Sequence, residues 1–253
     1  MYRKIIVPNV LLFLAINAAI AGNVPDAPVE LTAAQIIDKN VAARGGLQAW
    51  RAVQTLSMSG KLEAGGTQNT ELPFALEMKR PRKTRLELQF NGQTAVQVYD
   101  GVNGWKLRPF LNRRQVEPYT PEELKAASLQ ADLDGPLMDY NAKGTKLELA
   151  GVQPVEGRQA YNLKLTLKNG QVQHVWVDAQ TFLDVKFEGT PRRLDGKYHP
   201  VETYFRDFRQ VKGLMVPYVL ETAVEGAKRT EKIRIESVVV NPKLEDSHFT
   251  KPH

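Results

Sequence analysis

Residues 85–90 read RLELQF, followed directly by Asn91-Gly92. In an extended strand, Leu86, Leu88 and Phe90 share one face and the polar residues between them share the other. Such alternation is typical of an antiparallel sheet with one dry and one solvated face. Asn-Gly favours a tight hairpin turn, so the next strand should return alongside this one. The stretch therefore predicts a one-layer wall with an apolar lining.

The same alternation continues from Thr55 onward, in runs of about eight to twelve residues that are separated by turn residues. We expect strands at 56–64, 73–80, 84–90, 95–100, 104–109, 146–155, 160–167, 172–178, 183–189, 201–211, 215–224 and 231–239. No composition break is long enough to be a linker. We therefore predict a mainly β (α+β) fold of about 11–12 antiparallel strands, with residues 22–253 as a single domain.

A helix is predicted before the first strand. Thr32-Ala33-Ala34-Gln35 has the pattern of a capping box, in which the Thr hydroxyl and the Gln side chain each bind an amide at the helix start. Ile36, Ile37, Val41 and Ala42 then line one face, and Gly45-Gly46 ends the helix. A second short helical piece carries Leu47, Trp50 and Val53. This amphipathic segment needs an apolar surface to lie on.

A helical insertion is predicted at about 120–140, between the two sets of strands. Thr120-Pro121-Glu122-Glu123 is a favourable helix start, with proline at the first position and acids near the positive end of the helix dipole. Gly135-Pro136 interrupts the segment. We therefore expect two short helices that form a hinged lid.

The first 21 residues have the pattern of a cleavable secretory signal. Arg3 and Lys4 precede an apolar stretch, and Ala19-Ile20-Ala21 supplies the small residues that signal peptidase requires. Cleavage after Ala21 leaves 232 of the 253 residues. The alternative is an uncleaved anchor, but the stretch is shorter than the roughly 20 apolar residues of a spanning helix and is broken by Pro8 and Asn9.

Composition excludes several classes of function. The chain contains no cysteine, which excludes disulfides, thiol catalysis, thiolate metal sites and a lipid-modified cysteine. Its net charge is +6, and loss of Arg3 and Lys4 with the signal lowers this to +4. Basic and acidic residues are interspersed, whereas a nucleic-acid binder concentrates its positive charge. We expect a mildly basic, solvated surface and no nucleic-acid partner.

No catalytic or cofactor motif is found. The four histidines have no zinc-binding spacing, and the sequence lacks a Gly-x-Ser-x-Gly elbow, a phosphate loop and a calcium loop. Asp132, Asp134 and Asp139 lie near the insertion and are compatible with a paired-acid hydrolase, although acids also collect at helix ends and in turns. We predict a non-enzymatic protein without metal or cofactor, and an enzyme is the alternative.

Two basic runs lie at expected hairpins. Residues 79–85 read KRPRKTR, and Arg192-Arg193 with Lys197 forms the second run. Charge runs of this kind are more often exposed rims than sites. If they ringed the mouth of a cavity, they would attract lipid phosphate.

Several turns and strand ends give the chain a family resemblance. They lie at 36–47, 56–60, 99–105, 176–181, 207–217 and 241–249. In these stretches the chain resembles the outer-membrane lipoprotein-sorting proteins, the superfamily of LolA, LolB, LppX and RseB. The resemblance implies an incompletely closed antiparallel half-barrel whose concave apolar face is covered by helices. It also implies a periplasmic carrier, in a Gram-negative-type envelope, that holds lipid or lipoprotein acyl chains between sheet and lid on the way to the outer membrane.

The candidate site residues follow from the apolar strand positions and the lid. We predict that the cavity is lined by Leu86, Leu88, Phe90, Val96, Val98, Trp105, Leu163, Leu165, Trp176 and Phe187, and that Leu133, Leu137, Met138 and Tyr140 face it from the lid. The alternative is that these side chains fill the core themselves. No residue matches the carrier's basic lid latch, and Phe110-Leu111 is a candidate for the receptor's protruding apolar loop.

The expected partners are lipid or lipoprotein acyl chains and an inner- or outer-membrane protein, and we expect a monomer. The alternative function is a periplasmic sensor or adaptor of the same fold, which would bind a protein partner instead of lipid.

Overall fold

The computed structural model describes residues 31–63 and 71–252. The predicted signal at 1–21 lies outside the described residues. The helices and helical turns are α1 (Ala33–Ala43), α2 (Leu47–Arg51), η1 (Pro109–Leu111), α3 (Pro121–Gln130) and η2 (Asp246–Phe249). The strands of the first half are β1 (Thr55–Glu63), β2 (Glu71–Lys79), β3 (Lys83–Phe90), β4 (Gln93–Tyr99), β5 (Gly104–Arg108) and β6 (Arg113–Pro118). Those of the second half are β7 (Lys146–Val155), β8 (Arg158–Thr166), β9 (Val172–Asp178), β10 (Asp184–Glu188), β11 (Arg192–Leu194), β12 (Lys197–His199), β13 (Val201–Val211), β14 (Leu214–Val224) and β15 (Glu231–Val240).

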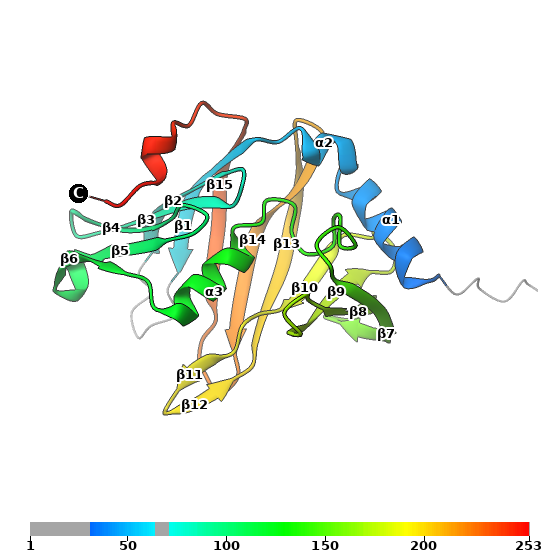
Figure 1. Cartoon of the computed structure of the whole chain (residues 1–253). Helices are drawn as coiled ribbons and strands as arrows, with labels where there is room; N and C mark the ends of the chain where they lie inside the picture. Colours follow the sequence, from blue (N-terminus) through cyan, green and yellow to red (C-terminus); the bar gives the residue numbers. More distant parts are fainter. Residues whose placement is uncertain (1–30, 64–70, 253) are drawn as a thin grey trace, which may run out of the picture. The chain divides into compact units, whose positions relative to one another are not determined.

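Thirteen strands form one open sheet in the order β6-β5-β4-β3-β2-β1-β15-β14-β13-β10-β9-β8-β7 (Figure 1). Neighbouring strands are antiparallel, and β6 and β7 are the two edges, so the sheet does not close. β1 joins the halves by pairing with both β2 and β15. The predicted mainly β, incompletely closed fold is confirmed, and the described chain has three strands beyond the twelve that were expected, one of them in the large sheet.

The sequence analysis did not predict β6 or the β11–β12 hairpin. β6 reads RRQVEP, which is polar and ends in proline, so it shows no apolar alternation. β11 and β12 have three residues each and form a separate two-stranded sheet. Strands this short carry almost no periodic signal, although Asp195-Gly196 between them is a turn pair.

The predicted start of each helical segment is confirmed. Thr32 with Gln35 forms a capping box at α1, and Thr120 with Glu123 forms one at α3. After α1, Gly45 and Gly46 have φ of +112° and +90°, so the chain turns into α2 at residues without a side chain.

The second helix expected in the insertion does not form. Residues 131–144 are turns, because Gly135 has φ +72° and precedes a proline, and Asp139 also has a positive φ. We name residues 131–145, between α3 and β7, the connecting segment.

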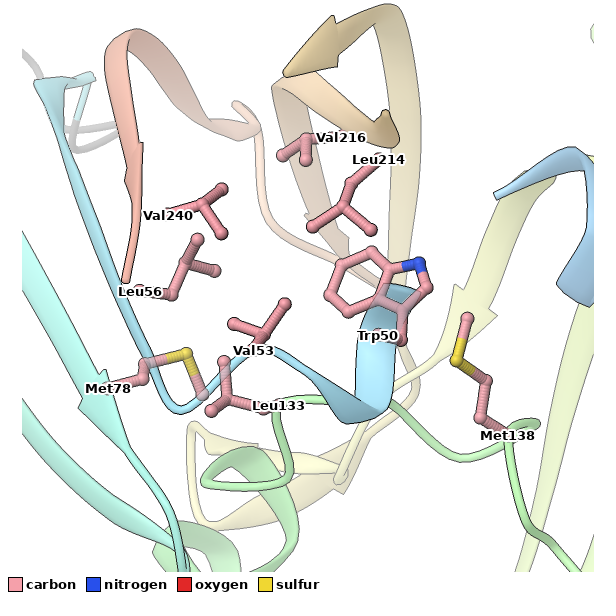
Figure 2. Close-up of a cluster of buried hydrophobic side chains, with 9 residues drawn as sticks. All are labelled: Trp50, Val53, Leu56, Met78, Leu133, Met138, Leu214, Val216 and Val240. Carbon is pink, nitrogen blue, oxygen red and sulfur yellow. The ribbon is translucent and has the colours of Figure 1, made fainter. Parts of the chain in front are cut away.

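One hydrophobic cluster joins α2 to the middle of the sheet. Figure 2 shows its nine side chains, which come from α2 and the residues after it, from four strands and from the connecting segment. They are Trp50, Val53, Leu56, Met78, Leu133, Met138, Leu214, Val216 and Val240. A second cluster packs Ile36 and Ile37 of α1 against Leu163 and Leu165 of β8. Both clusters fix the helices on the sheet.

A buried carboxylate ties the turn between β9 and β10. Asp178 is 1% exposed, and its Oδ1 accepts hydrogen bonds from the Gln180 and Thr181 amides and from the Thr181 hydroxyl, at 2.7–3.0 Å. Its Oδ2 lies 2.7 Å from Arg158 Nη2. Burial opposes ionisation, but the hydrogen bonds from Thr181 and Gln180 and the charge of Arg158 outweigh it and lower the pKa of Asp178.

This turn predicts a loss of stability in acid. A carboxyl group with a lowered folded-state pKa stabilises the fold above its unfolded pKa of about 3.9, and this contribution disappears as the pH falls through the folded pKa. We expect the wild type to lose more unfolding free energy than Asp178→Asn between pH 6 and pH 3, measured by urea denaturation. Equal losses in the two proteins would show that Asp178 is not coupled to folding.

Candidate ligand-binding face

The strand register assigns every sheet residue to one of two faces, because directly opposite residues in antiparallel strands point the same way. Leu86 of β3 pairs with Leu76 of β2, which pairs with Met58 of β1. Met58 in turn pairs with Val238 of β15. We name the face that carries these residues the inner face. α2 packs on it through Leu56, and α1 packs on it through Leu163.

An apolar strip lies on the inner face across β1, β2, β3, β13, β14 and β15. Phe74, Tyr218 and Ile235 are buried at 8–9% exposure, and nine more apolar residues pack against them while staying partly exposed. These nine are Met58, Leu62, Leu76, Leu86, Leu88, Val211, Leu220, Ile233 and Val238. We name the twelve residues the apolar strip. It contrasts with the surface under α1, where Leu163 and Leu165 are 0% exposed.

The predicted lining residues on the inner face fall into two groups. Leu86 and Leu88 belong to the apolar strip, and Phe90 lies on the same face of β3. The Phe90 and Phe110 rings are edge-to-face, with their centroids 5.7 Å apart. Leu163, Leu165 and Phe187 pack instead with Ile36 and Ile37 of α1. The second group fills a core against α1, which was the alternative for these residues.

The other four predicted lining residues lie on the outer face of the sheet. Val96 pairs with Glu87, and Val98 pairs with Arg85 and Trp105, so all three side chains point away from Leu86. The C-terminal η2 covers them with Phe249, which is 1% exposed. Trp176 pairs with Asn162 and packs with Val155 and Ala160, opposite Leu163. The ten residues that were predicted to line one cavity therefore lie on two opposite faces of the sheet.

The four predicted lid residues come from the connecting segment and are mostly buried. Leu133 and Met138 pack around Trp50, whereas Leu137 and Tyr140 pack with the α1 cluster. Leu137 and Met138 are at most 1% exposed. The connecting segment thus contributes side chains to both clusters that join the helices to the sheet. These four side chains are part of the core.

Ion pairs fix the connecting segment. Arg80 binds both oxygens of Asp134 at 2.9 and 2.5 Å, and Arg44 donates to the Asp134 carbonyl at 3.1 Å. The hydrogen bond to Asp134 raises the pKa of Arg80 further above its usual value. Asp139 pairs with Arg51, and Asp132 pairs with Lys143 at 2.7 Å.

These pairs give the three acids a structural role. Each of Asp132, Asp134 and Asp139 holds a cation, so they form no pair of free carboxylates for hydrolysis. Among the basic residues of the 79–85 run, Arg80 is engaged with Asp134 and Arg85 with Glu87.

A polar cluster lies beneath α1. Asn40 is 0% exposed and donates to the Phe182 carbonyl at 2.7 Å and to Asp184 at 3.0 Å. Arg44 Nε lies 3.9 Å from the Asp184 carboxylate. Burial raises the pKa of Asp184, and the charge of Arg44 and the amide of Asn40 offset this only in part. These polar contacts link α1 to β10 and so position the helix on the sheet.

α3 is attached to the sheet differently from α1 and α2. None of its residues is buried. Its strongest attachment is Glu123, whose two oxygens both lie 2.5 Å from Lys106 Nζ on β5. Burial raises the pKa of Glu123, but hydrogen bonds from Lys106 and the Thr120 amide, with the charges of Lys106 and Arg108, outweigh it and lower the pKa. α3 is therefore tied to β5 by an ion pair and has no fully buried side chain.

Two pockets on the described chain each include one predicted lining residue, Phe90 in the first and Val96 in the second. One is lined by Glu71, Pro73 and the residues 89–94 at the β3–β4 turn, and the other lies beside the C-terminal segment at Arg85, Val96 and His248. Neither contains Leu86 or Leu88. Within residues 31–63 and 71–252, no group of three histidine or acidic side chains is placed to hold a metal ion. The helices in these ranges are too short or too polar to cross a bilayer.

Comparisons with known proteins find the fold but no sequence relative. No protein-family model and no curated protein matches the sequence. A LolA superfamily protein from Nitrosomonas europaea is 16% identical with a TM-score of 0.56, over 87% of this chain and 98% of that one. A domain described as an outer membrane lipoprotein-sorting protein domain from Vibrio parahaemolyticus is 13% identical with a TM-score of 0.56, over 85% and 95%. A DUF1329 family protein from Desulfovibrio piger is 14% identical with a TM-score of 0.56, over 87% and 97%. The chain thus has the fold of LolA superfamily structures, as its sequence resemblance predicts, and identities this low show the fold alone.

Proposed function

We propose that this protein carries lipid or lipoprotein acyl chains on its apolar strip, in the periplasm and on the way to the outer membrane. The main observation in support is the strip itself, in which nine apolar side chains stay partly exposed on the face of the sheet that the helices also contact. A folded chain normally buries such residues against one another, and apolar side chains that stay partly exposed side by side are a candidate binding surface. The likeness to LolA superfamily structures supports the same reading.

The energetics of the proposal need no polar motif. Each methylene group removed from water contributes about 0.8 kcal/mol, so an acyl chain that places about eight methylenes on the strip gains roughly 6 kcal/mol before the cost of ordering it. The role also requires no catalytic group. Transfer would need a membrane protein or a membrane surface at each end of the route, and a monomer is sufficient.

Identification of a bound lipid tests the proposal. The protein would be expressed with its N-terminal residues, purified from the periplasm without detergent and extracted with organic solvent. We expect mass spectrometry to find phospholipid or acylated peptide in near-equal molar amount to the protein. Protein that yields no lipid, and that takes up none from vesicles, would contradict the carrier role. A protein partner captured by such lipid-free material would then favour the sensor or adaptor alternative.

A further inference from the structure

Two cations lie on the inner face beside the apolar strip. Lys106 of β5 is 7% exposed and pairs with Gln97 of β4, which pairs with Leu86 of the strip. Arg108 follows Lys106 by two residues along the strand and therefore shares its face. Its partner Glu117 is opposite Lys106 in β6, which places the guanidinium on the same side. A row of side chains thus runs from buried positive charge directly to exposed apolar surface.

The charges in this cluster do not balance within the described chain. Lys106 binds Glu123, whereas Arg108 and Arg113 both reach Glu117, at 3.2 and 3.5 Å. Three cations therefore share two carboxylates. Arg108 Nε is buried and has no hydrogen-bond partner among the described residues. A buried donor without a partner costs free energy, and an anion bound at the cluster would remove that cost.

Glu123 is the exchangeable member of the cluster. The Lys106 side chain is 8% exposed and fixed in a strand, whereas the Glu123 side chain is 38% exposed and belongs to α3, which buries no residue. Glu123 can therefore move into water with its helix at little cost. Lys106 cannot do so, and a buried ammonium without a counter-charge is strongly unfavourable. Displacement of Glu123 is favourable only if another anion takes its position.

We propose that Lys106 and Arg108 form a headgroup site for anionic lipids. The carboxylate or phosphate of the lipid replaces the Glu123 carboxylate on Lys106 and accepts a hydrogen bond from Arg108 Nε, while the acyl chain extends over Leu86 and Leu88. The inference rests on the proposed carrier function for the acyl chain, and it adds the class of lipid. Release of Glu123 also frees α3 from its main attachment, so binding of the headgroup and movement of α3 are coupled.

Competition between matched lipids tests the site. Delipidated protein is loaded with the neutral fluorescent probe N-phenyl-1-naphthylamine, which is then displaced by oleate or by methyl oleate. The two lipids share one acyl chain and differ in the charge of the headgroup. We expect oleate to bind at least about tenfold more tightly, since charge-assisted hydrogen bonds are among the stronger polar contacts. Acetate and inorganic phosphate, which have no acyl chain, should not displace the probe.

Three variants localise the effect. Lys106→Met should remove the preference for oleate and leave methyl oleate binding unchanged. Glu123→Gln keeps an acceptor for the Thr120 amide but removes the competing charge, so it should bind oleate about tenfold more tightly than wild type. Lys125→Met is the matched control, because Lys125 is an exposed cation on the same helix, and it should behave as wild type.

The outcomes separate this inference from the carrier proposal. Equal affinity of wild type for oleate and methyl oleate overturns the headgroup site and leaves the carrier role standing. Failure of both lipids to displace the probe overturns both. If circular dichroism shows that Lys106→Met does not fold, Glu123→Gln and Arg108→Gln decide, with opposite changes in oleate affinity expected. Unchanged oleate affinity in both variants also overturns the site.

Discussion

Trp50→Ala is expected to lower the free energy of unfolding by about 3–5 kcal/mol, the usual cost of truncating a buried tryptophan. Trp50 of α2 is 4% exposed, and its side chain belongs to the same buried cluster as Leu214 and Val53 (Figure 2). Its Nε1 donates to the Arg44 carbonyl at 2.9 Å, and the Arg44 guanidinium lies 4.7 Å from its ring. One side chain therefore holds the end of α1, α2 and the connecting segment together.

Thermal and urea denaturation measure this loss. For a domain of this size, a change of 3–5 kcal/mol corresponds to a fall in melting temperature on the order of 10 °C. Trp50→Phe is the matched variant, since it keeps a ring in the cluster and loses the Nε1 hydrogen bond, and it should cost less than half as much. A loss below about 1 kcal/mol for Trp50→Ala would show that the cluster does not stabilise the fold.

Local chemistry made much of the fold predictable from the sequence. Thr32 with Gln35 and Thr120 with Glu123 specify helix starts because both partners of each capping box lie within one turn. Asn91-Gly92 specifies a hairpin for a similar reason, since both residues adopt positive φ. Strands on both sides of such turns alternate strongly enough to be located within a few residues. Each of these features depends on neighbours in the chain.

The assignment of residues to faces was the weaker part of the sequence analysis, although a signal was present. A two-residue turn at 91–92 pairs Phe90 with Gln93, and the same register pairs Leu86 with Gln97. Even-numbered residues of β3 therefore share a face with odd-numbered residues of β4. Val96 and Val98 must then point away from Leu86 and Leu88. Hydrophobicity alone placed them together, whereas turn length separates them.

Other parts of the site depend on contacts between distant residues and leave no local signal. Asp134 is fixed by Arg80 and Arg44, which lie 54 and 90 residues away in the sequence. Phe249 covers Val96 and Val98 from the far end of the chain. Lys106 read as one more solvated charge on a strand, whereas its side chain is 8% exposed and pairs with Glu123 of α3. Sequence patterns alone therefore could not predict the ion pairs of the connecting segment, the covering of Val96 and Val98 by Phe249, or the burial of Lys106.

The second large effect is expected at the β3 edge of the apolar strip, next to the Lys106–Arg108 cluster. Leu88 is partly exposed and pairs with Phe74 and Ala95. Under the proposed function, an acyl chain would lie against its side chain. Leu88→Asp places a carboxylate there, and covering that charge with a hydrocarbon chain costs several kcal/mol. We expect the amount of lipid that co-purifies with the protein to fall by about 100-fold, which corresponds to roughly 2.8 kcal/mol.

Two comparisons make the Leu88→Asp result decisive. Val239→Asp is the matched control, because Val239 is 44% exposed and points to the outer face, being paired with Ser57 next to Leu56. It introduces the same charge into the same sheet and should retain the wild-type amount of lipid. Leu88→Met keeps the apolar surface and should also retain it. Since Leu88 is only partly buried, Leu88→Asp should remain folded by circular dichroism, so that loss of lipid reports on the strip and not on unfolding. Wild-type lipid content in folded Leu88→Asp would mean that acyl chains do not extend over the β3 edge of the strip.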